Sequence, residues 1–192
     1  MKKKVYIFDI DGTIVNSLIY FRSIVKIFEF ICPILYVEPQ KGKKIVCGFI
    51  WDCFQRINFK MEIFPGVKEF FEKIEDNSEI YFISCRREKH RKYTINQLKA
   101  LLPKNFDFSS RLLLAPTKIT WKDAKNFKVI EARKIIKQFF DSKIILIEDD
   151  PHLLNNLPNC PRIVKILYQH KKNNGTPLYP WFCSGVLICK TI

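Results

Sequence analysis

Apolar segments of five or six residues recur along the chain, and helical patterns separate the later ones. The apolar segments are rich in Ile, Leu, Val, Tyr and Phe, and they cover residues 4–8, 79–84, 111–115, 143–147 and 162–167. Apolar residues at helical spacing cover residues 65–75, 88–102 and 126–140. Strands that alternate with helices are typical of βαβ units, in which helices cover both faces of a parallel sheet. We therefore predict an α/β fold with a parallel sheet flanked by helices.

The segment between the first strand and Pro65 does not follow this alternation. Residues 17–31 and 45–57 each show an amphipathic helical pattern, with a break that contains two prolines and a glycine. We predict a small helical cap insertion over residues 17–59. The alternatives are two further core helices or a patch that lies on a membrane surface.

This insertion divides the predicted chain into parts. Residues 1–16 and 60–170 form the α/β core, and residues 171–192 form a C-terminal extension to which the sequence assigns no role.

The net charge of the chain indicates which classes of partner it binds, and its cysteine content indicates its compartment. The chain has 33 Lys and Arg residues against 19 Asp and Glu residues, a net charge of +14, which favours phosphorylated metabolites, nucleic acid ends or acidic membrane surfaces as partners. A Lys-rich but ordinary surface is the alternative. The seven cysteines show no CxxC spacing, so we expect a reduced, cytoplasmic protein. No apolar run reaches the ~18 residues of a transmembrane segment.

Acidic and hydroxyl side chains follow several predicted strands. Asp9 and Asp11 come directly after the first strand, Ser84 ends the second, and residues 148–150 are all acidic. Ligands of parallel sheets bind beyond the carboxyl ends of the strands, so we expect these side chains to meet. Two carboxylates that lie close together repel each other, so they need a cation, a shared proton or a strongly polar setting.

These residue types suit phosphoryl transfer. A carboxylate can attack phosphorus and form an aspartyl-phosphate, while a second acid protonates the leaving group. A hydroxyl and an ammonium group can hold the phosphoryl oxygens. A further acidic residue can complete an oxygen-rich Mg²⁺ site.

Four segments, in this order, resemble the motifs of the haloacid dehalogenase (HAD) superfamily, in its phosphatase branch. They are YIFDIDGT, IYFISCR, NFKVIEARKII and ILIEDDP. The resemblance covers the chain from Lys4 to about Leu167 and implies a Rossmann-like fold. It also implies that Asp9 is the nucleophile and that Asp11 is the general acid and base, with the Asp11 backbone carbonyl on the metal. Members that cleave carbon–halogen bonds lack the second aspartate, so the presence of Asp11 indicates phosphate chemistry.

The remaining roles follow from the same resemblance. Ser84 is the phosphate-binding hydroxyl, and Lys128, at the start of a helix, is the phosphate-site lysine, with Lys125 and Lys122 as competitors. The fourth motif carries ILIEDDP where glycine–aspartate is common. Aligning the strand ends favours Asp149 as the direct Mg²⁺ ligand and Asp150 as a partner that supports the metal site indirectly or through water. The departure from the common form leaves the choice of the direct ligand open between the two.

Arg86 is a further candidate, as a fork for a second anionic group of the substrate, although a solvated helix start is an equal interpretation. We expect a Mg²⁺-dependent phosphatase acting through an aspartyl-phosphate on a small phosphorylated substrate, such as a nucleotide or a polynucleotide end. The alternatives are a lipid-phosphate phosphatase in peripheral contact with a membrane, and a non-catalytic binding module that keeps the fold.

Overall fold

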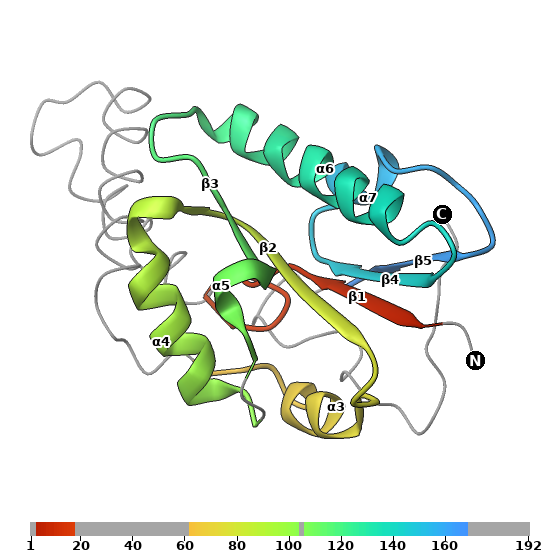
Figure 1. The fold of residues 1–192 in the computed structure, drawn as a ribbon. Helices are drawn as coiled ribbons and strands as arrows, with labels where there is room; N and C mark the ends of the chain where they lie inside the picture. The colour runs from red at the N-terminus through yellow and green to blue at the C-terminus, as the bar shows by residue number, and fades with distance from the viewer. Residues whose placement is uncertain (1–2, 18–61, 104–105, 169–192) are drawn as a thin grey trace, which may run out of the picture.

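The computed structural model of the chain describes residues 3–17, 62–103 and 106–168. Within them, a parallel sheet has the strand order β3-β2-β1-β4-β5 (Figure 1). The strands are β1 (Lys4–Phe8), β2 (Glu79–Arg87), β3 (Leu112–Ala115), β4 (Lys143–Glu148) and β5 (Ile163–Leu167). The helices are α3 (Val67–Lys73), the 3-10 helix η1 (Glu88–His90), α4 (Arg91–Leu101), α5 (Phe108–Arg111), α6 (Trp121–Gln138) and α7 (Pro151–Asn155). The predicted α/β fold is confirmed.

Side chains of β1 alternate between two hydrophobic clusters, one on each face of the sheet. Val5 and Ile7 pack in the cluster that contains the apolar faces of α6 and α7. Phe8 packs in the other cluster, with Phe71 of α3 and Leu98 of α4. Figure 1 shows these helices as layers on opposite sides of the sheet. Burial on both faces explains why β1 is a continuous apolar segment in the sequence.

The strand order changes direction at β1: β2 and β3 lie on one side of this strand, and β4 and β5 lie on the other. The chain passes from β1 to β2 and β3 on one side, and α6 then carries it back to β4 on the other side of β1. Connections from β1 and β3 therefore diverge near the carboxyl ends of β1 and β4. In α/β sheets this is where ligands bind.

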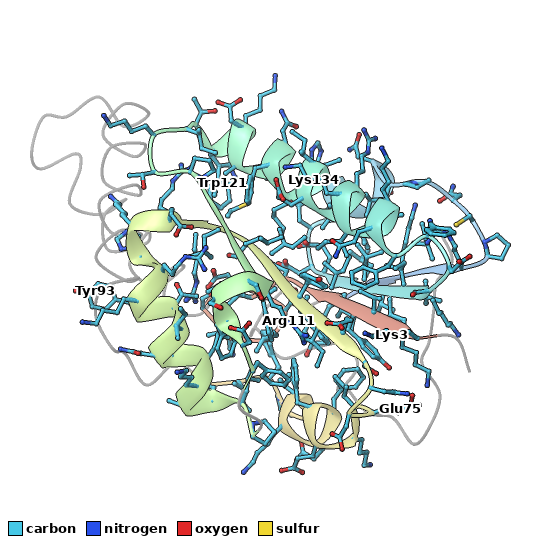
Figure 2. All side chains as sticks on the ribbon, viewed as in Figure 1. Lys3, Glu75, Tyr93, Arg111, Trp121 and Lys134 are labelled. Atoms are coloured by element: carbon cyan, nitrogen blue, oxygen red, sulfur yellow. The ribbon has the colours of Figure 1, made fainter. Side chains whose placement is uncertain are left out.

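The amino-terminal edge of the sheet carries surface ion pairs instead. Glu79, the first residue of β2, lies 2.5 Å from Lys3 Nζ and 2.7 Å from Arg111 Nη2. Lys3 and Arg111 are labelled in Figure 2. Nearby, Lys4 pairs with Glu75. Exposed pairs of this kind contribute at most about 1 kcal/mol each to stability. The acidic residues that follow the predicted strands lie at the opposite end of the sheet, where the strands have their carboxyl ends.

Helix α6 begins at Trp121, five residues before the predicted start at residue 126. A capping box begins it: the Thr120 side chain accepts a hydrogen bond from Asp123 N, and the Asp123 carboxylate accepts one from Thr120 N. Lys128 consequently lies seven residues after the first residue of the helix, about two turns in, rather than at its start.

Two predicted segments lie outside the described residues. They are the cap insertion over residues 17–59, except for Ser17, and the C-terminal extension over residues 171–192. None of the helices in the described part of the chain combines the length and the apolar character that crossing a bilayer requires.

Candidate active site

Asp9 stands at the carboxyl end of β1 and is almost completely buried, with 6% of its surface exposed. Its backbone N–H donates to the carbonyl oxygen of Ile147 at 3.0 Å, which continues the pairing between β1 and β4 by one residue. Phe8 is already paired with Ile147 in the register of these strands, so Asp9 lies beside Glu148, the last residue of β4.

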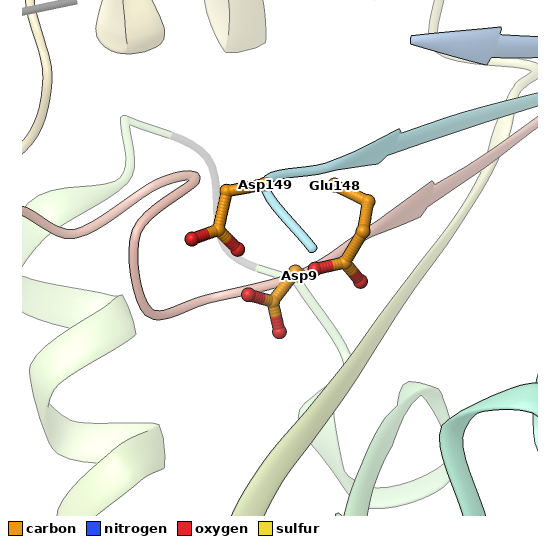
Figure 3. Close-up of side chains that lie close together, drawn as sticks. All are labelled: Asp9, Glu148 and Asp149. Carbon is orange, nitrogen blue, oxygen red and sulfur yellow. The ribbon is translucent and has the colours of Figure 1, made fainter. Parts of the chain in front are cut away.

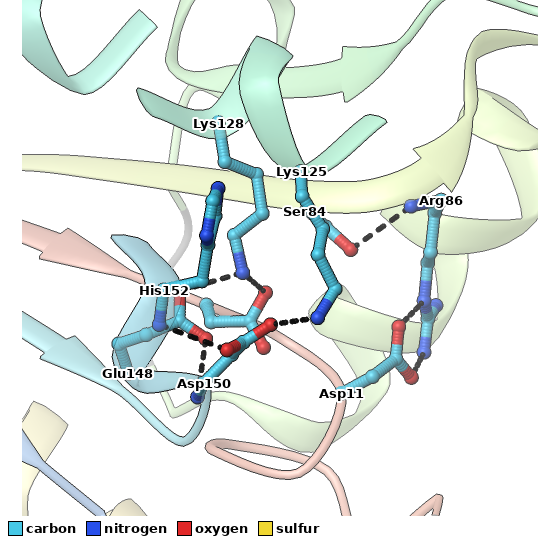
Figure 4. A network of polar contacts seen from close by, with 9 residues as sticks. Asp11, Ser84, Arg86, Lys125, Lys128, Glu148, Asp150 and His152 are labelled. Carbon is cyan, nitrogen blue, oxygen red and sulfur yellow. Dashed lines mark hydrogen bonds and ion pairs between the residues drawn. The ribbon is translucent and has the colours of Figure 1, made fainter. Parts of the chain in front are cut away.

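Lys128 reaches this point from α6 and lies between two carboxylates. Its Nζ is 2.8 Å from Asp9 Oδ1 and 2.5 Å from Glu148 Oε2 (Figure 4). Burial alone would lower the pKa of Lys128, but the charges of Asp9 and Glu148 outweigh burial and raise that pKa well above its usual value. Lys128 is therefore a fixed cation. Of the competing lysines, Lys125 pairs with Asp150 at 2.6 Å, and Lys122 is exposed.

The structure brings together a group of three carboxylates, which we call the acidic cluster: Asp9, Glu148 and Asp149 (Figure 3). One oxygen from each lies within 4.8 Å of the others. Burial, followed by the charge of a neighbouring carboxylate, raises the pKa of Asp9 and of Asp149 to about 7, against the attraction of Lys128. Burial is also the largest cause that raises the pKa of Glu148 to about 7. One lysine does not balance two buried carboxylates and a third that is partly buried, so the cluster favours a further cation.

Two observations indicate that a divalent cation fits the acidic cluster. Glu148 Oε2 is buried and, although it lies close to Lys128 Nζ, it has no partner in hydrogen-bond geometry among the described residues. The side-chain donors are all carboxylate oxygens, which suit a hard cation such as Mg²⁺.

Gly12 provides the space for this arrangement. A Cβ atom at Gly12 would lie 2.3 Å from Asp149 Oδ2, and the residue has φ of +86°. Both features require glycine, because an L side chain would collide with Asp149 and rarely adopts this φ. The glycine of the YIFDIDGT segment therefore lets the loop after β1 pass directly over the Asp149 carboxylate.

Asp150 lies next to the acidic cluster in sequence but outside the group of converging oxygens. Its carboxylate accepts a hydrogen bond from His152 N at 2.9 Å, which caps α7, and pairs with Lys125. Partial burial would raise the pKa of Asp150, but the hydrogen bonds from Lys125 and His152 lower it overall. The carboxylate of Asp149 thus belongs to the acidic cluster, and that of Asp150 does not.

The end of β2 carries two further polar residues of the candidate site, Ser84 and Arg86. The pairing of β2 with β3 shifts register between Ser84 and Arg87, a β-bulge or irregularity of the kind often found beside active sites. Ser84 and Arg86 are both buried, with 1% and 2% of their surfaces exposed, and Ser84 Oγ accepts a hydrogen bond from Arg86 N at 3.2 Å. The Ser84 hydroxyl proton therefore does not serve that bond and can be donated to an anion.

Arg86 also binds the carboxylate of Asp11. The guanidinium donates from Nε to Asp11 Oδ2 and from Nη2 to Asp11 Oδ1, each at 2.7 Å (Figure 4). Arg86 was expected to face a second anion of the substrate. In the structure, a carboxylate of the chain itself occupies its fork.

The structure also identifies a residue that the sequence analysis left without a role. Glu148 belongs to the acidic cluster and contacts Lys128. A signal for it was present, because Glu148 is the last residue of β4, which pairs with β1, and Asp9 directly follows β1. The expected ligands Asp9 and Asp149 converge with it, whereas Asp11 and Asp150 are paired with Arg86 and Lys125.

Comparison with known proteins agrees with this geometry. The family described as HAD superfamily, subfamily IIIB (acid phosphatase), matches residues 1–148. This match covers more than half of the 192 residues, and the chain belongs to this family. The resemblance to the HAD superfamily seen in the four motifs is therefore confirmed. No curated protein matches the sequence at a significant level.

Solved structures show the same fold at low sequence identity. The class C acid phosphatase from Bacillus anthracis with tungstate bound is 19% identical, with a TM-score of 0.54, over 83% of this chain and 55% of that protein. A family IA HAD hydrolase from Entamoeba histolytica is 14% identical, with a TM-score of 0.53, over 88% of this chain and 84% of that one. A haloacid dehalogenase-like hydrolase from Streptococcus pneumoniae is 14% identical, with a TM-score of 0.51, over 86% and 84%. The chain thus spans about half the length of the class C phosphatase.

Proposed function

We propose that the protein is a magnesium-dependent phosphatase that hydrolyses a phosphomonoester through an aspartyl-phosphate on Asp9. The observation that carries this proposal is the convergence of the acidic cluster and Lys128 at the carboxyl ends of β1 and β4. Membership in the acid phosphatase subfamily supports the reaction class.

In the first step, an oxygen of Asp9 attacks phosphorus and the bond to the leaving oxygen breaks. Asp11 gives its proton to that oxygen, so the alcohol leaves neutral. Lys128, which contacts Asp9, offsets the charge of the phosphoryl oxygens, and the Ser84 hydroxyl donates a hydrogen bond to one of them.

In the second step, Asp11 accepts a proton from a water molecule as that water attacks the phosphorus of phospho-Asp9. The bond between phosphorus and the Asp9 oxygen breaks, which releases inorganic phosphate and restores the carboxylate. The two roles of Asp11 are the forward and reverse directions of one proton transfer.

Asp9, Glu148 and Asp149 would hold the Mg²⁺ ion, with the backbone carbonyl of Asp11 that the family resemblance implies. When bound, Mg²⁺ supplies positive charge that offsets the acidic cluster and the phosphoryl oxygens. The contact of Asp150 with Lys125 supports a place for Asp150 outside direct coordination.

For the substrate, we propose nucleotides or the phosphorylated ends of polynucleotides. The net charge of +14 and the aromatic residues of the predicted cap segment support this class, because bases stack on aromatic side chains. A panel of nucleotides, 3′- and 5′-phosphorylated oligonucleotides and phosphorylated metabolites tests it. Turnover restricted to lipid phosphates in anionic vesicles would contradict it and favour action at a membrane surface.

The reaction itself is tested by measuring phosphate release from aryl and alkyl phosphates with Mg²⁺, after EDTA, and after Mg²⁺ is restored. We expect EDTA to stop turnover and Mg²⁺ to recover it, and Asp9→Asn to lose three orders of magnitude or more, roughly the range of nucleophile deletions. A folded wild-type protein that releases no phosphate with any divalent metal or substrate of the panel would favour the non-catalytic binding module.

A further inference from the structure

Arg86 uses the donor groups on all three guanidinium nitrogens within the chain. Nε and Nη2 form the fork on the two oxygens of Asp11, and Nη1 donates to Gln97 Oε1 at 2.6 Å. Its side chain is 3% exposed, and the Asp11 side chain is 14% exposed. Gln97 lies on α4, the helix that follows β2, so the guanidinium is held from two elements.

This arrangement fixes the place of the Asp11 carboxylate. Asp11 is two residues from Asp9, yet its oxygens are absent from the acidic cluster. Figure 4 shows Asp11 beside Arg86 and apart from Glu148 and Lys128. A forked guanidinium engages both oxygens in one plane, so it restricts the rotation of the carboxylate as well as its position. A lysine ammonium acts as a point charge and does not impose this plane.

We propose that Arg86, held by Gln97, is a positioning residue that keeps Asp11 apart from the acidic cluster and beside the leaving-group oxygen. The fork on both oxygens holds the ionised carboxylate, the form that accepts the proton of the attacking water, and one of its two bonds opens when Asp11 carries the proton that the leaving oxygen receives. This inference rests on the proposed function, because it assigns Asp11 the proton transfer. It gives Arg86 a different role from contact with a second anion of the substrate. It also gives Gln97, which no motif singles out, a part in the reaction.

Arg86 could position Asp11, or it could contact a second anion of the substrate. These two roles predict a different dependence of the rate on the leaving group. Proton transfer matters most for an alkyl phosphate, whose alkoxide is a poor leaving group, and little for 4-nitrophenyl phosphate, whose phenolate leaves readily. Loss of an anion contact would weaken binding of a substrate that carries a second anion, and would spare both of these esters.

The test is kcat/KM for 4-nitrophenyl phosphate and for a simple alkyl phosphate in Arg86→Lys and Gln97→Leu. We expect the alkyl ester to lose at least ~10-fold more than the aryl ester, a part of the 10²–10⁴-fold that general acid catalysis contributes. Arg87→Lys and Asn96→Ala are matched controls, because Arg87 makes one long contact with Pro116 O and Asn96 is exposed on α4. We expect both controls to match the wild type.

A double variant makes the test specific to Asp11. If Gln97 and Arg86 act through Asp11, Gln97→Leu should add little to the loss caused by Asp11→Asn, whereas independent effects would multiply. Gln97→Leu keeps both Arg86 and Asp11 in the chain and removes only the bond from Arg86 Nη1, so it keeps the test valid if Arg86→Lys does not fold, which circular dichroism will show.

Equal losses with both esters, or losses that multiply with Asp11→Asn, would overturn the positioning role while the phosphatase assignment stands. A wild-type protein that releases no phosphate from these esters or from any substrate of the panel would overturn the proposed function, and the positioning role with it.

Discussion

Asp149 and Asp150 are neighbours in sequence but have different surroundings. Asp149 converges with Asp9 and Glu148, while Asp150 caps α7 and pairs with Lys125. We therefore expect Asp149→Asn to raise the Mg²⁺ concentration needed for half-maximal activity far more than Asp150→Asn. A Mg²⁺ titration of phosphate release measures this. A larger effect of Asp150→Asn would mean that the metal lies one residue further along the chain.

Gly12→Ala should reduce both stability and activity. The positive φ costs an L residue about 1–2 kcal/mol, and the added Cβ would push the Asp149 carboxylate away from the acidic cluster. Thermal unfolding and the Mg²⁺ titration measure the two effects separately.

Gly66→Ala is the matched control for this change. Gly66 has φ of 85° at the start of α3, so its substitution has a similar backbone cost but lies outside the acidic cluster. We expect it to lower the melting temperature without changing the Mg²⁺ response. If Gly12→Ala lowers stability but keeps a normal Mg²⁺ response, the contact between Gly12 and Asp149 has no part in metal binding.

At the scale of residues, the sequence predicted the position of those candidate site residues that occupy strand ends. Asp9, Ser84 and Asp149 could be placed because apolar segments mark where strands stop. The Asp11–Arg86 fork could not, because it joins residues 75 positions apart and depends on the irregular end of β2. Glu148 was expected among the side chains that meet but received no role, because the acidic residue types at 148–150 do not reveal which carboxylate turns toward β1.

At the scale of elements, each strand predicted from the sequence is present within the described residues, with ends shifted by up to three residues. The start of α6 was wrong because the prediction followed the apolar spacing and did not use the Thr120–Asp123 capping box. The short helices α5 and α7 were not predicted. Helix α5 has four residues and α7 has five, too few to show a helical period.

Thr120→Ala should destabilise the protein by about 1 kcal/mol, because it removes a capping side chain from the helix that carries Lys128. This corresponds to a fall in melting temperature of about 2–4 °C for a chain of this size. Thr117→Ala, at an exposed position before the same helix, is the control and should be close to neutral.

The pH dependence of this loss provides a second check. Hydrogen bonds from Thr120 lower the pKa of Asp123, so they stabilise the folded state above the ordinary pKa of Asp, and that contribution is lost as the pH falls through the lowered value. The difference in melting temperature between the wild type and Thr120→Ala should therefore narrow in acid. A constant difference would indicate that only the bond to the backbone of Asp123 matters.

At the scale of the whole molecule, the two edges of the sheet have different roles. The amino-terminal edge carries surface ion pairs around Glu79, and the carboxyl edge carries the acidic cluster, Lys128 and the Asp11–Arg86 fork. Residues from β1, β2, β4 and α6, distant in sequence, meet at this edge because the sheet is parallel and its connections diverge there. The fold thus determines which of the many charged residues can act together.

The proposed reaction requires that Asp9 becomes covalently phosphorylated. The most direct measurement is mass spectrometry of protein quenched in acid during turnover, followed by peptide analysis. We expect a fraction of the protein to carry one phosphoryl group on the peptide that contains Asp9, and none in the Asp9→Asn variant or in the presence of EDTA. Rapid turnover without this adduct, together with substantial activity of Asp9→Asn, would contradict the account and indicate that water attacks the substrate directly.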